Sequence, residues 1–208
     1  KFSPDQLFRG VHESVAIKTP GKAEMLVKHT EVAGDIPGMY DDFMYLNTPS
    51  GSGDGIAISG LTRFGDEYIS TQFEDGGERP GFKFKGIRVL LNNTGTEALK
   101  TYMPIGWVGN FDLANLGDDK EQYRWSIQIM NNRAKDDYTA IVDMMQALSL
   151  TGTALQNRID DVIDVDQWMR VFALQSLWGI GDAYTQGNPH NLDFYVRPSD
   201  GKVIAMPW

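Results

Sequence analysis

The feature that most constrains the fold is an apolar helix that a polar loop joins to a β-hairpin. Asp164 is a good N-cap residue, and the residues after it, 165–178, carry apolar side chains at helical spacing. Apolar residues cover more than one face of this helix, so we expect it to be buried. They are Val165, Trp168, Met169, Val171, Phe172, Leu174 and Trp178. Gly179 and Gly181 are expected to end the helix. After the loop, residues 192–196 and 202–206 flank a Pro-Ser-Asp-Gly turn, which is typical of a hairpin.

The first half of the chain has the pattern of a β-rich region. The expected strands are residues 43–47, 56–61, 67–73 and 82–85. Glycine-rich turns, such as residues 51–55, separate them. A short helix is expected at residues 5–18, and residues 24–30 fit either a strand or a continuation of that helix.

The second half of the chain is mainly helical. Asp136 and Asp137 are expected to cap a helix over residues 138–149, and a shorter helix is expected over residues 157–163. Strands first and helices later favour an α+β fold.

Composition excludes several classes of protein. The 208 residues carry a net charge of −9 with no cluster of Lys and Arg, which argues against a nucleic-acid binder. Such a chain can still bind ATP, because Mg²⁺ carries the phosphate charge and carboxylates hold the Mg²⁺. The absence of cysteine excludes disulfides, thiolate metal sites and cysteine nucleophiles. No apolar run reaches the ~20 residues of a membrane span.

The loop over residues 179–191 carries the residues with most chemical potential. Asp182, Asn188, His190 and Asn191 lie within ten positions. Phosphoryl transfer needs an Asp to accept or orient the attacking hydroxyl, and an Asn with a second Asp to hold Mg²⁺. The order in this sequence, a helix, then a loop from Asp to Asn, then a hairpin, is the order in which kinases present these residues. The match stops at Trp208, where the second Asp would be expected next. The alternative is a structural loop, in which Asp182 caps a turn, Asn188 starts one and His190 is a buried donor.

At this segment the sequence resembles the CotH kinase family, which is named after a spore-coat protein. The strongest similarity covers residues 164–208: the capped helix, the loop from Asp182 to Asn191, and the final Pro207-Trp208, which is similar to the start of a Pro-Trp-Asp-x-Asp metal motif. Weaker similarity covers residues 131–148, including Asp136-Asp137-Tyr138, and residues 8–13.

The resemblance implies an atypical protein-kinase-like fold that binds ATP and Mg²⁺ or Mn²⁺. It implies phosphorylation of Ser or Thr on secreted or surface proteins, and hence an extracellular or cell-surface location. Asp182 would be the catalytic residue, and Asn191 or Asn188 a metal ligand. Asn191 is preferred because it lies where the loop becomes a strand. Their spacings from Asp182, nine and six residues, exceed the spacing of about five in ordinary kinases.

The resemblance also implies that the domain is incomplete, with a β-rich part over residues 1–100 and a helical part over residues 101–208. The family's nucleotide-binding Lys would precede Lys1 and its second metal-binding Asp would follow Trp208, so we expect this chain to be inactive alone. Glu74 is a candidate for an acid that assists nucleotide binding, although a charged turn residue explains it as well.

Two other kinds of protein remain as alternatives. One is a non-catalytic surface or coat protein that keeps the kinase-like fold and works by binding. The other is a carbohydrate-associated β-rich module, for which the five tryptophans are the only support.

Overall fold

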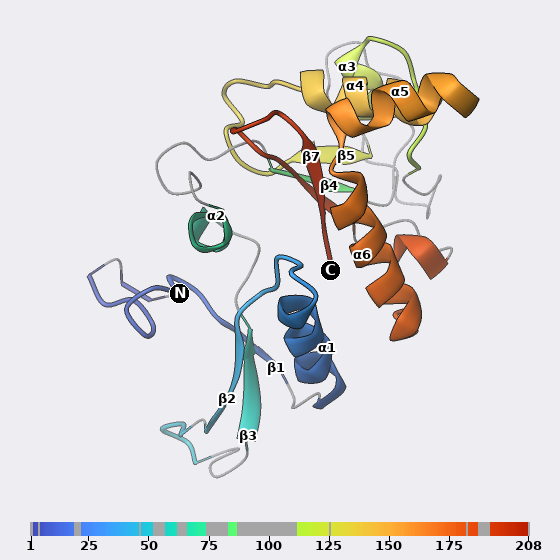
Figure 1. The fold of residues 1–208 in the computed structure, drawn as a ribbon. Helices are drawn as coiled ribbons and strands as arrows, with labels where there is room; N and C mark the ends of the chain where they lie inside the picture. The colour runs from blue at the N-terminus through green and yellow to red at the C-terminus, as the bar shows by residue number, and fades with distance from the viewer. Residues whose placement is uncertain are drawn as a thin grey trace, which may run out of the picture. The chain divides into compact units, whose positions relative to one another are not determined.

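The computed structural model describes residues 2–3, 5–18, 22–45, 47–51, 57–61, 66–73, 83–86, 112–124, 126–181, 183–186 and 192–207. The chain forms two compact units, residues 1–80 (unit 1) and residues 81–208 (unit 2). The boundary expected near residue 100 lies outside the described residues and stays a prediction. The described residues form a mixture of helix and strand that is compatible with the α+β class (Figure 1). None of their helices is long and apolar enough to cross a membrane.

The described residues of unit 1 form a three-stranded antiparallel sheet and two helices. The strands lie in the order β1 (Ala16–Lys18), β3 (Ala57–Leu61) and β2 (Asp41–Tyr45), and the helices are α1 (Lys22–Ala33) and α2 (Asp66–Gln72). Residues 24–30 therefore lie in a helix. The strands expected at 43–47 and 56–61 are confirmed with shifts of one or two residues.

The helix expected at residues 5–18 is wrong. Arg9 and Gly10 both have positive φ, 51° and 74°, and they turn the chain so that Phe8 and His12 form an antiparallel bridge. A right-handed helix cannot continue through two consecutive positive φ values. The last three residues of the stretch pair instead with β3, Ala16 opposite Leu61 and Lys18 opposite Ser59.

The strand expected at residues 67–73 is also wrong, because α2 occupies this stretch. Its buried side chains, Tyr68 and Ile69, are consecutive, whereas a half-buried strand buries alternate residues. The hydroxyl of Thr71 donates to the carbonyl of Tyr68 at 3.0 Å, which is a local contact that suits a helix.

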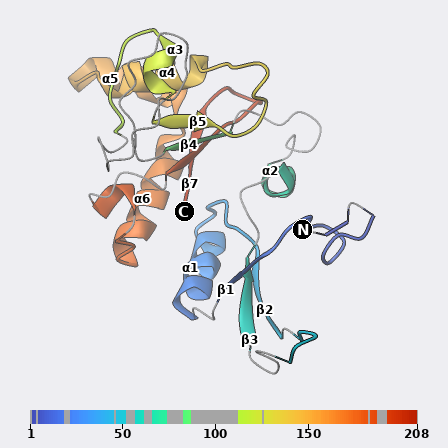
Figure 2. The ribbon, with the colours of Figure 1, turned by 180° about the vertical axis from the view of Figure 1, so that it is seen from behind.

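Unit 2 is built on a four-stranded antiparallel sheet in the order β5 (Ile127–Ile129), β4 (Lys83–Gly86), β6 (Asp193–Val196) and β7 (Val203–Met206). The expected strand at 82–85 and the expected hairpin are confirmed as β4 and as β6–β7. Among the described residues of unit 2, four α-helices and one 3₁₀ turn accompany the sheet. They are α3 (Lys120–Tyr123), α4 (Thr139–Leu148), α5 (Gly152–Val162), α6 (Val165–Leu177) and η1 (Tyr184–Gln186). Figures 1 and 2 show α6 beside β7, with α4 and α5 together at one end of unit 2.

The core of unit 2 lies between α6, α4 and the β6–β7 hairpin. All four residues of β7 are buried, and Trp168 on α6 is 1% exposed and stacks on Phe194 with ring centroids 5.8 Å apart. Burying side chains of this size stabilises the fold by about 2–3 kcal/mol each. The sheet and α6 therefore hold each other in place.

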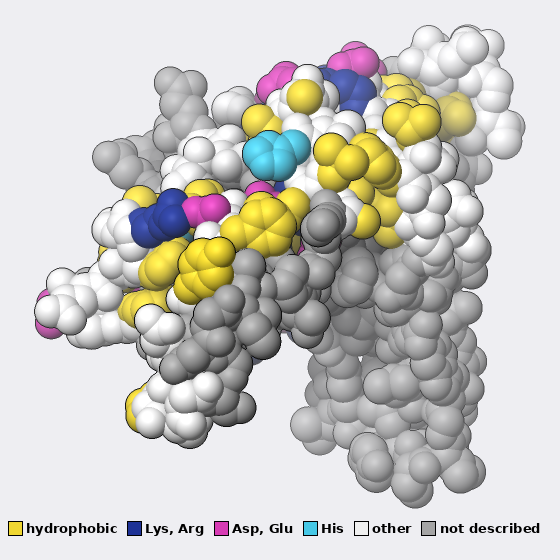
Figure 3. Space-filling model, turned by 90° about the horizontal axis from the view of Figure 1, so that it is seen from below, with side chains coloured by type: hydrophobic (Ala, Val, Ile, Leu, Met, Phe, Trp, Pro, Cys, Tyr) yellow, Lys and Arg dark blue, Asp and Glu magenta, His cyan; other side chains and the backbone are white. Residues whose placement is uncertain are grey.

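The expectation that α6 is buried on most of its surface is wrong in part. Met169 is 52% exposed, Leu177 80% and Trp178 36%, because the helix contacts the sheet along one face only. Two glutamines, Gln167 and Gln175, occupy buried positions on that face instead. Hydrophobic side chains also reach the surface elsewhere, as one face of the molecule shows in Figure 3.

The helix expected at residues 138–149 is confirmed as α4, but its two aspartates have different roles. Asp137 accepts a hydrogen bond from the backbone N–H of Thr139 at 2.9 Å, as expected of a residue at the start of a helix. Asp136 contacts Lys120 and Arg124 instead. The helix expected at 157–163 is longer than predicted and begins at Gly152, where φ is +58°.

Candidate functional site

The expected site residues Asp182, Asn188, Asn191 and Glu74 lie outside the described residues. The structure does describe what flanks the loop: residues 179–181 before Asp182, residues 183–186 after it, and the strand that begins after Asn191. The geometry of these flanks can therefore be compared with the needs of the proposed chemistry.

The N-terminus of α6 is tied to the hairpin. Asp164 caps the helix as predicted, its Oδ1 accepting from the N–H of Gln167 at 3.2 Å. Its Oδ2 pairs with Nη1 of Arg197 at 3.3 Å, and Arg197 also binds Asp200 in the turn. The guanidinium of Arg197 lowers the pKa of the Asp200 carboxyl through a direct hydrogen bond. One arginine thus links the helix start to the hairpin turn.

The first turns of α6 also bind the outer edge of β7. The side chain of Gln167 bonds to both backbone groups of Ala205, and Nε1 of Trp168 donates to the carbonyl of Val203 at 2.9 Å. A strand at the edge of a sheet has unpaired backbone groups, and here helix side chains satisfy them.

The C-terminus of α6 ends as the two glycines predicted. Gly179 has a φ of +61°, and the N–H of Ile180 donates to the carbonyl of Gln175 at 3.0 Å. This bond folds the chain back over the last helical turn. Gly181, the next residue, is the last one described before Asp182.

Immediately after Asp182, η1 packs on α6. Ala183 is fully buried, and the ring of Tyr184 stacks on Phe172 at 6.1 Å with an interplanar angle of 18°. The Tyr184 hydroxyl donates to Oδ1 of Asp112 at 3.2 Å, and burial together with this carboxylate raises the pKa of Tyr184 to about 12. The hydroxyl of Thr185 donates to Oε1 of Gln175 at 3.4 Å.

On the far side of the loop, β6 begins in the core. Leu192 is fully buried and Asp193 is 2% exposed, with Asp193 opposite Met206 on β7 and Lys85 on β4. The described residues before and after the stretch from Asp182 to Asn191 therefore both belong to packed structure. That agrees with the predicted helix–loop–hairpin order.

Sequence reasoning missed the two glutamines of α6. Gln167, Val171 and Gln175 recur every four residues, so they lie on one face of the helix together with buried apolar residues. That spacing can be read from the sequence. It places both glutamines on the buried face of the helix rather than on a solvent-exposed face.

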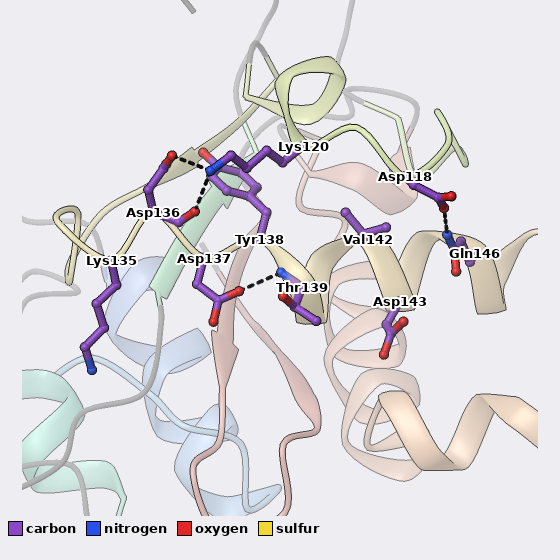
Figure 4. A pocket seen from close by; sticks show the side chains of 10 residues that line it. All are labelled: Asp118, Lys120, Lys135, Asp136, Asp137, Tyr138, Thr139, Val142, Asp143 and Gln146. Atoms are coloured by element: carbon purple, nitrogen blue, oxygen red, sulfur yellow. Dashed lines mark hydrogen bonds and ion pairs between the residues drawn. The ribbon is translucent and has the colours of Figure 1, made fainter.

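A separate cavity of about 640 Å³ opens beside the start of α4 (Figure 4). Its lining is mostly charged: Asp118, Lys120, Lys135, Asp136, Asp137 and Asp143, with Tyr138, Thr139, Val142 and Gln146. Nζ of Lys120 lies 2.7 Å from Oδ2 of Asp136, and Nη1 of Arg124 lies 2.6 Å from its Oδ1. Hydrogen bonds from Arg124 and Lys120 hold the pKa of Asp136 well below its usual range. The Asp136 carboxylate is thus already paired with Lys120 and Arg124. We therefore interpret the charged side chains beside this cavity as a network with a structural role.

No group of three His, Asp or Glu side chains that could hold a metal ion occurs among the described residues. The loop itself offers one carboxylate, Asp182, and three carboxamides, Gln186, Asn188 and Asn191, whose oxygens are the ligand type that Mg²⁺ and Mn²⁺ take in proteins. By donor chemistry the sequence of the loop fits a divalent cation bound to phosphate oxygens.

A family model described as CotH kinase protein matches residues 88–208, which include α6, the loop and the hairpin. The resemblance predicted from the sequence is therefore confirmed. A search of curated proteins found no match.

Proposed function

Because this chain belongs to the CotH kinase protein family, we propose that it forms part of an atypical protein kinase. In this proposal the protein transfers the γ-phosphoryl group of ATP to a Ser or Thr hydroxyl of a protein substrate. The family match is the observation that carries the proposal, since its 121 residues include the whole segment with the expected catalytic loop.

Asp182 is proposed as the catalytic residue that accepts or orients the attacking hydroxyl. In its support, the residues on either side of it are held by α6: Ile180 through the backbone of Gln175, and Tyr184 through its stacking on Phe172. A catalytic carboxylate needs such preorganised surroundings to act on a bound substrate.

Asn191, with Asn188 as the second candidate, is proposed to hold the divalent cation. When bound, Mg²⁺ or Mn²⁺ would neutralise charge on the phosphates. Asn191 lies one residue before the buried Leu192, so its backbone leads directly into a fixed strand. Asn188 lies further from that anchor in the sequence, which is why it ranks second.

The remaining expectations belong to the same proposal. They are the kinase-like fold, a location outside the cell or at its surface, and Glu74 as an acid near the nucleotide. Nothing in the described residues of unit 1 bears on Glu74.

The proposal is tested on the full-length protein with γ-labelled ATP, Mg²⁺ or Mn²⁺, and a mixture of secreted proteins from the same source. We expect label on Ser or Thr of an acceptor protein and none when the metal is chelated. Label on no protein in either metal would contradict the proposal and favour a non-catalytic coat or surface protein with the same fold.

A further inference from the structure

Helix α1 of unit 1 buries charged side chains and exposes apolar ones. Lys28 is 4% exposed and Glu31 0%, whereas Leu26 is 53% exposed and Val32 68%. The helix lies beside β2 of the unit 1 sheet (Figures 1 and 2). A helix that packs on a sheet normally does the reverse, because buried apolar surface is what holds it in place. The packing of α1 therefore depends on the state of its buried charges.

The buried charges of this helix are not balanced. Oε1 of Glu31 pairs with Nζ of Lys28 at 3.2 Å. Its other oxygen, Oε2, is buried without a hydrogen-bond partner among the described residues, and so is Oδ2 of Asp41 at the start of β2. A Cβ atom on Gly38 would lie 3.0 Å from Oε2 of Glu31, so the backbone of Gly38 closes in on this oxygen. Two carboxyl groups thus face one ammonium group.

The surrounding groups do not correct the imbalance. On α1, Glu24 adds negative charge near both carboxyl groups, and His29 lies near Asp41. A buried carboxylate without enough partners is costly, and it takes up a proton instead. Burial accordingly raises the pKa of Glu31 and that of Asp41. Because the docked state holds the added proton more tightly than the open state, docking weakens as pH rises through these raised pKa values.

We propose that the packing of α1 on the sheet of unit 1 is a pH-sensitive device. The helix stays docked while the cluster of Lys28, Glu31 and Asp41 holds an added proton, and it opens locally when both carboxyl groups are charged. Leu26 and Val32 already lie mostly in solvent, so they add little apolar burial against this opening. The inference goes beyond the phosphoryl transfer and does not depend on it, because it concerns the described residues of unit 1 alone.

The test is amide hydrogen exchange of the full-length protein at pH 4.5 and pH 7, with each rate divided by its intrinsic rate to give a protection factor. We expect the protection of α1 to fall about tenfold or more in the wild-type protein, since one released proton changes the opening equilibrium by up to about tenfold per pH unit. Glu31→Gln mimics the protonated residue, so its α1 should change less than about threefold. Glu13→Gln makes the same change at an exposed residue of unit 1 and should behave like the wild type.

Two further readings separate a local device from general unfolding. The amides of α4 in unit 2 should keep their protection at both pH values, and Asp41→Asn should give a smaller fall in α1 than the wild type. An unchanged α1 in the wild-type protein, or an equal fall in wild type and E31Q, would overturn the proposal. So would an equal fall in α1 and α4, which would mean that the whole protein opens. A fall in D41N as large as in the wild type would overturn the shared role of the two carboxyl groups.

Discussion

Gln167 binds Ala205 through both ends of its side-chain amide. Its Nε2 donates to the Ala205 carbonyl at 2.6 Å, and its Oε1 accepts from the Ala205 N–H at 3.1 Å. The side chain thereby completes the outer edge of β7 in the way that a neighbouring strand would. This contact fixes α6, and with it the start of the loop, relative to the hairpin at the end of the loop.

Replacing Gln167 by Met should destabilise unit 2 strongly. Both bonds are lost, and the buried N–H and C=O of Ala205 are left without partners, so we expect a loss of about 2–4 kcal/mol. The measurement is chemical denaturation followed by tryptophan fluorescence. Gln156→Met on exposed α5 is the matched control and should change stability by less than about 0.5 kcal/mol. Equal stability of Q167M and Q156M would contradict the assigned role.

Glu31 should make the stability of unit 1 depend on pH. Burial raises the pKa of Glu31 above its ordinary value of 4.5, although Lys28 lies 3.2 Å from its Oε1 and lowers the pKa in part. The negative charges of Asp41 and Glu24 act in the same direction as burial. Because the folded state holds this proton more tightly than the unfolded state, stability falls as pH rises from about 4.5 through the folded pKa.

The measurement is the melting temperature of wild type and Glu31→Gln between pH 4.5 and 7.5. We expect the difference, variant minus wild type, to grow with pH, because the glutamine cannot ionise. Asp41, whose pKa burial also raises, remains in both proteins, and because its charge acts on Glu31, the loss of their repulsion in the variant adds to the difference in the same direction as pH rises. A difference that does not change with pH would show that Glu31 is not destabilised by its burial.

Asp136 should stabilise unit 2, and its contribution should depend on pH in the direction opposite to that of Glu31. Arg124 and Lys120 lower its pKa, so its contribution is complete above the ordinary value of 3.8 and is lost as pH falls through the folded pKa. Asp136→Asn keeps a residue that tolerates the positive φ of 48° at this position. The side chain is about one-third exposed, so we expect a loss of about 1–2 kcal/mol at pH 7 after allowing for solvent screening. Denaturation at pH 7 and at pH 2 checks this, since the difference between wild type and D136N should shrink at the lower pH.

Removal of the proposed metal ligand should weaken metal activation specifically. Asn191→Ala is expected to raise the Mg²⁺ concentration for half-maximal activity by about tenfold or more, because a carboxamide ligand to a hard cation is lost. Asn188→Ala is the comparison, and we expect a smaller shift. A larger shift in N188A than in N191A would exchange their roles.

Much of unit 2 could be predicted from the sequence because its signals are local. Asp164 caps α6, and the turn before Gly201 joins two apolar runs, so helix start and hairpin follow from nearby residues alone. Unit 1 was predicted less well. Arg9 adopts a left-handed backbone conformation that cannot be predicted from its residue type. The adjacent apolar residues Tyr68 and Ile69 of α2 fit a strand as easily as a helix.

The candidate site divides in the same way. Asp182 and its glycine-flanked loop are visible in the sequence, and the family resemblance is confirmed, whereas the role of Asp182 stays a prediction. The contacts of Gln167 and Gln175 are not visible in the sequence, because they join α6 to backbone and side chains up to 38 positions away. Helical spacing marks these glutamines as facing the core, but only the fold reveals their partners.

The most direct test of the central claim is the rate of phosphoryl transfer by Asp182→Asn in the full-length protein. Asparagine has nearly the same size but cannot accept a proton from the attacking hydroxyl, so we predict that kcat falls by about 100-fold or more while ATP still binds. Equal rates in the wild-type protein and in D182N would contradict the assignment of Asp182 as the catalytic residue.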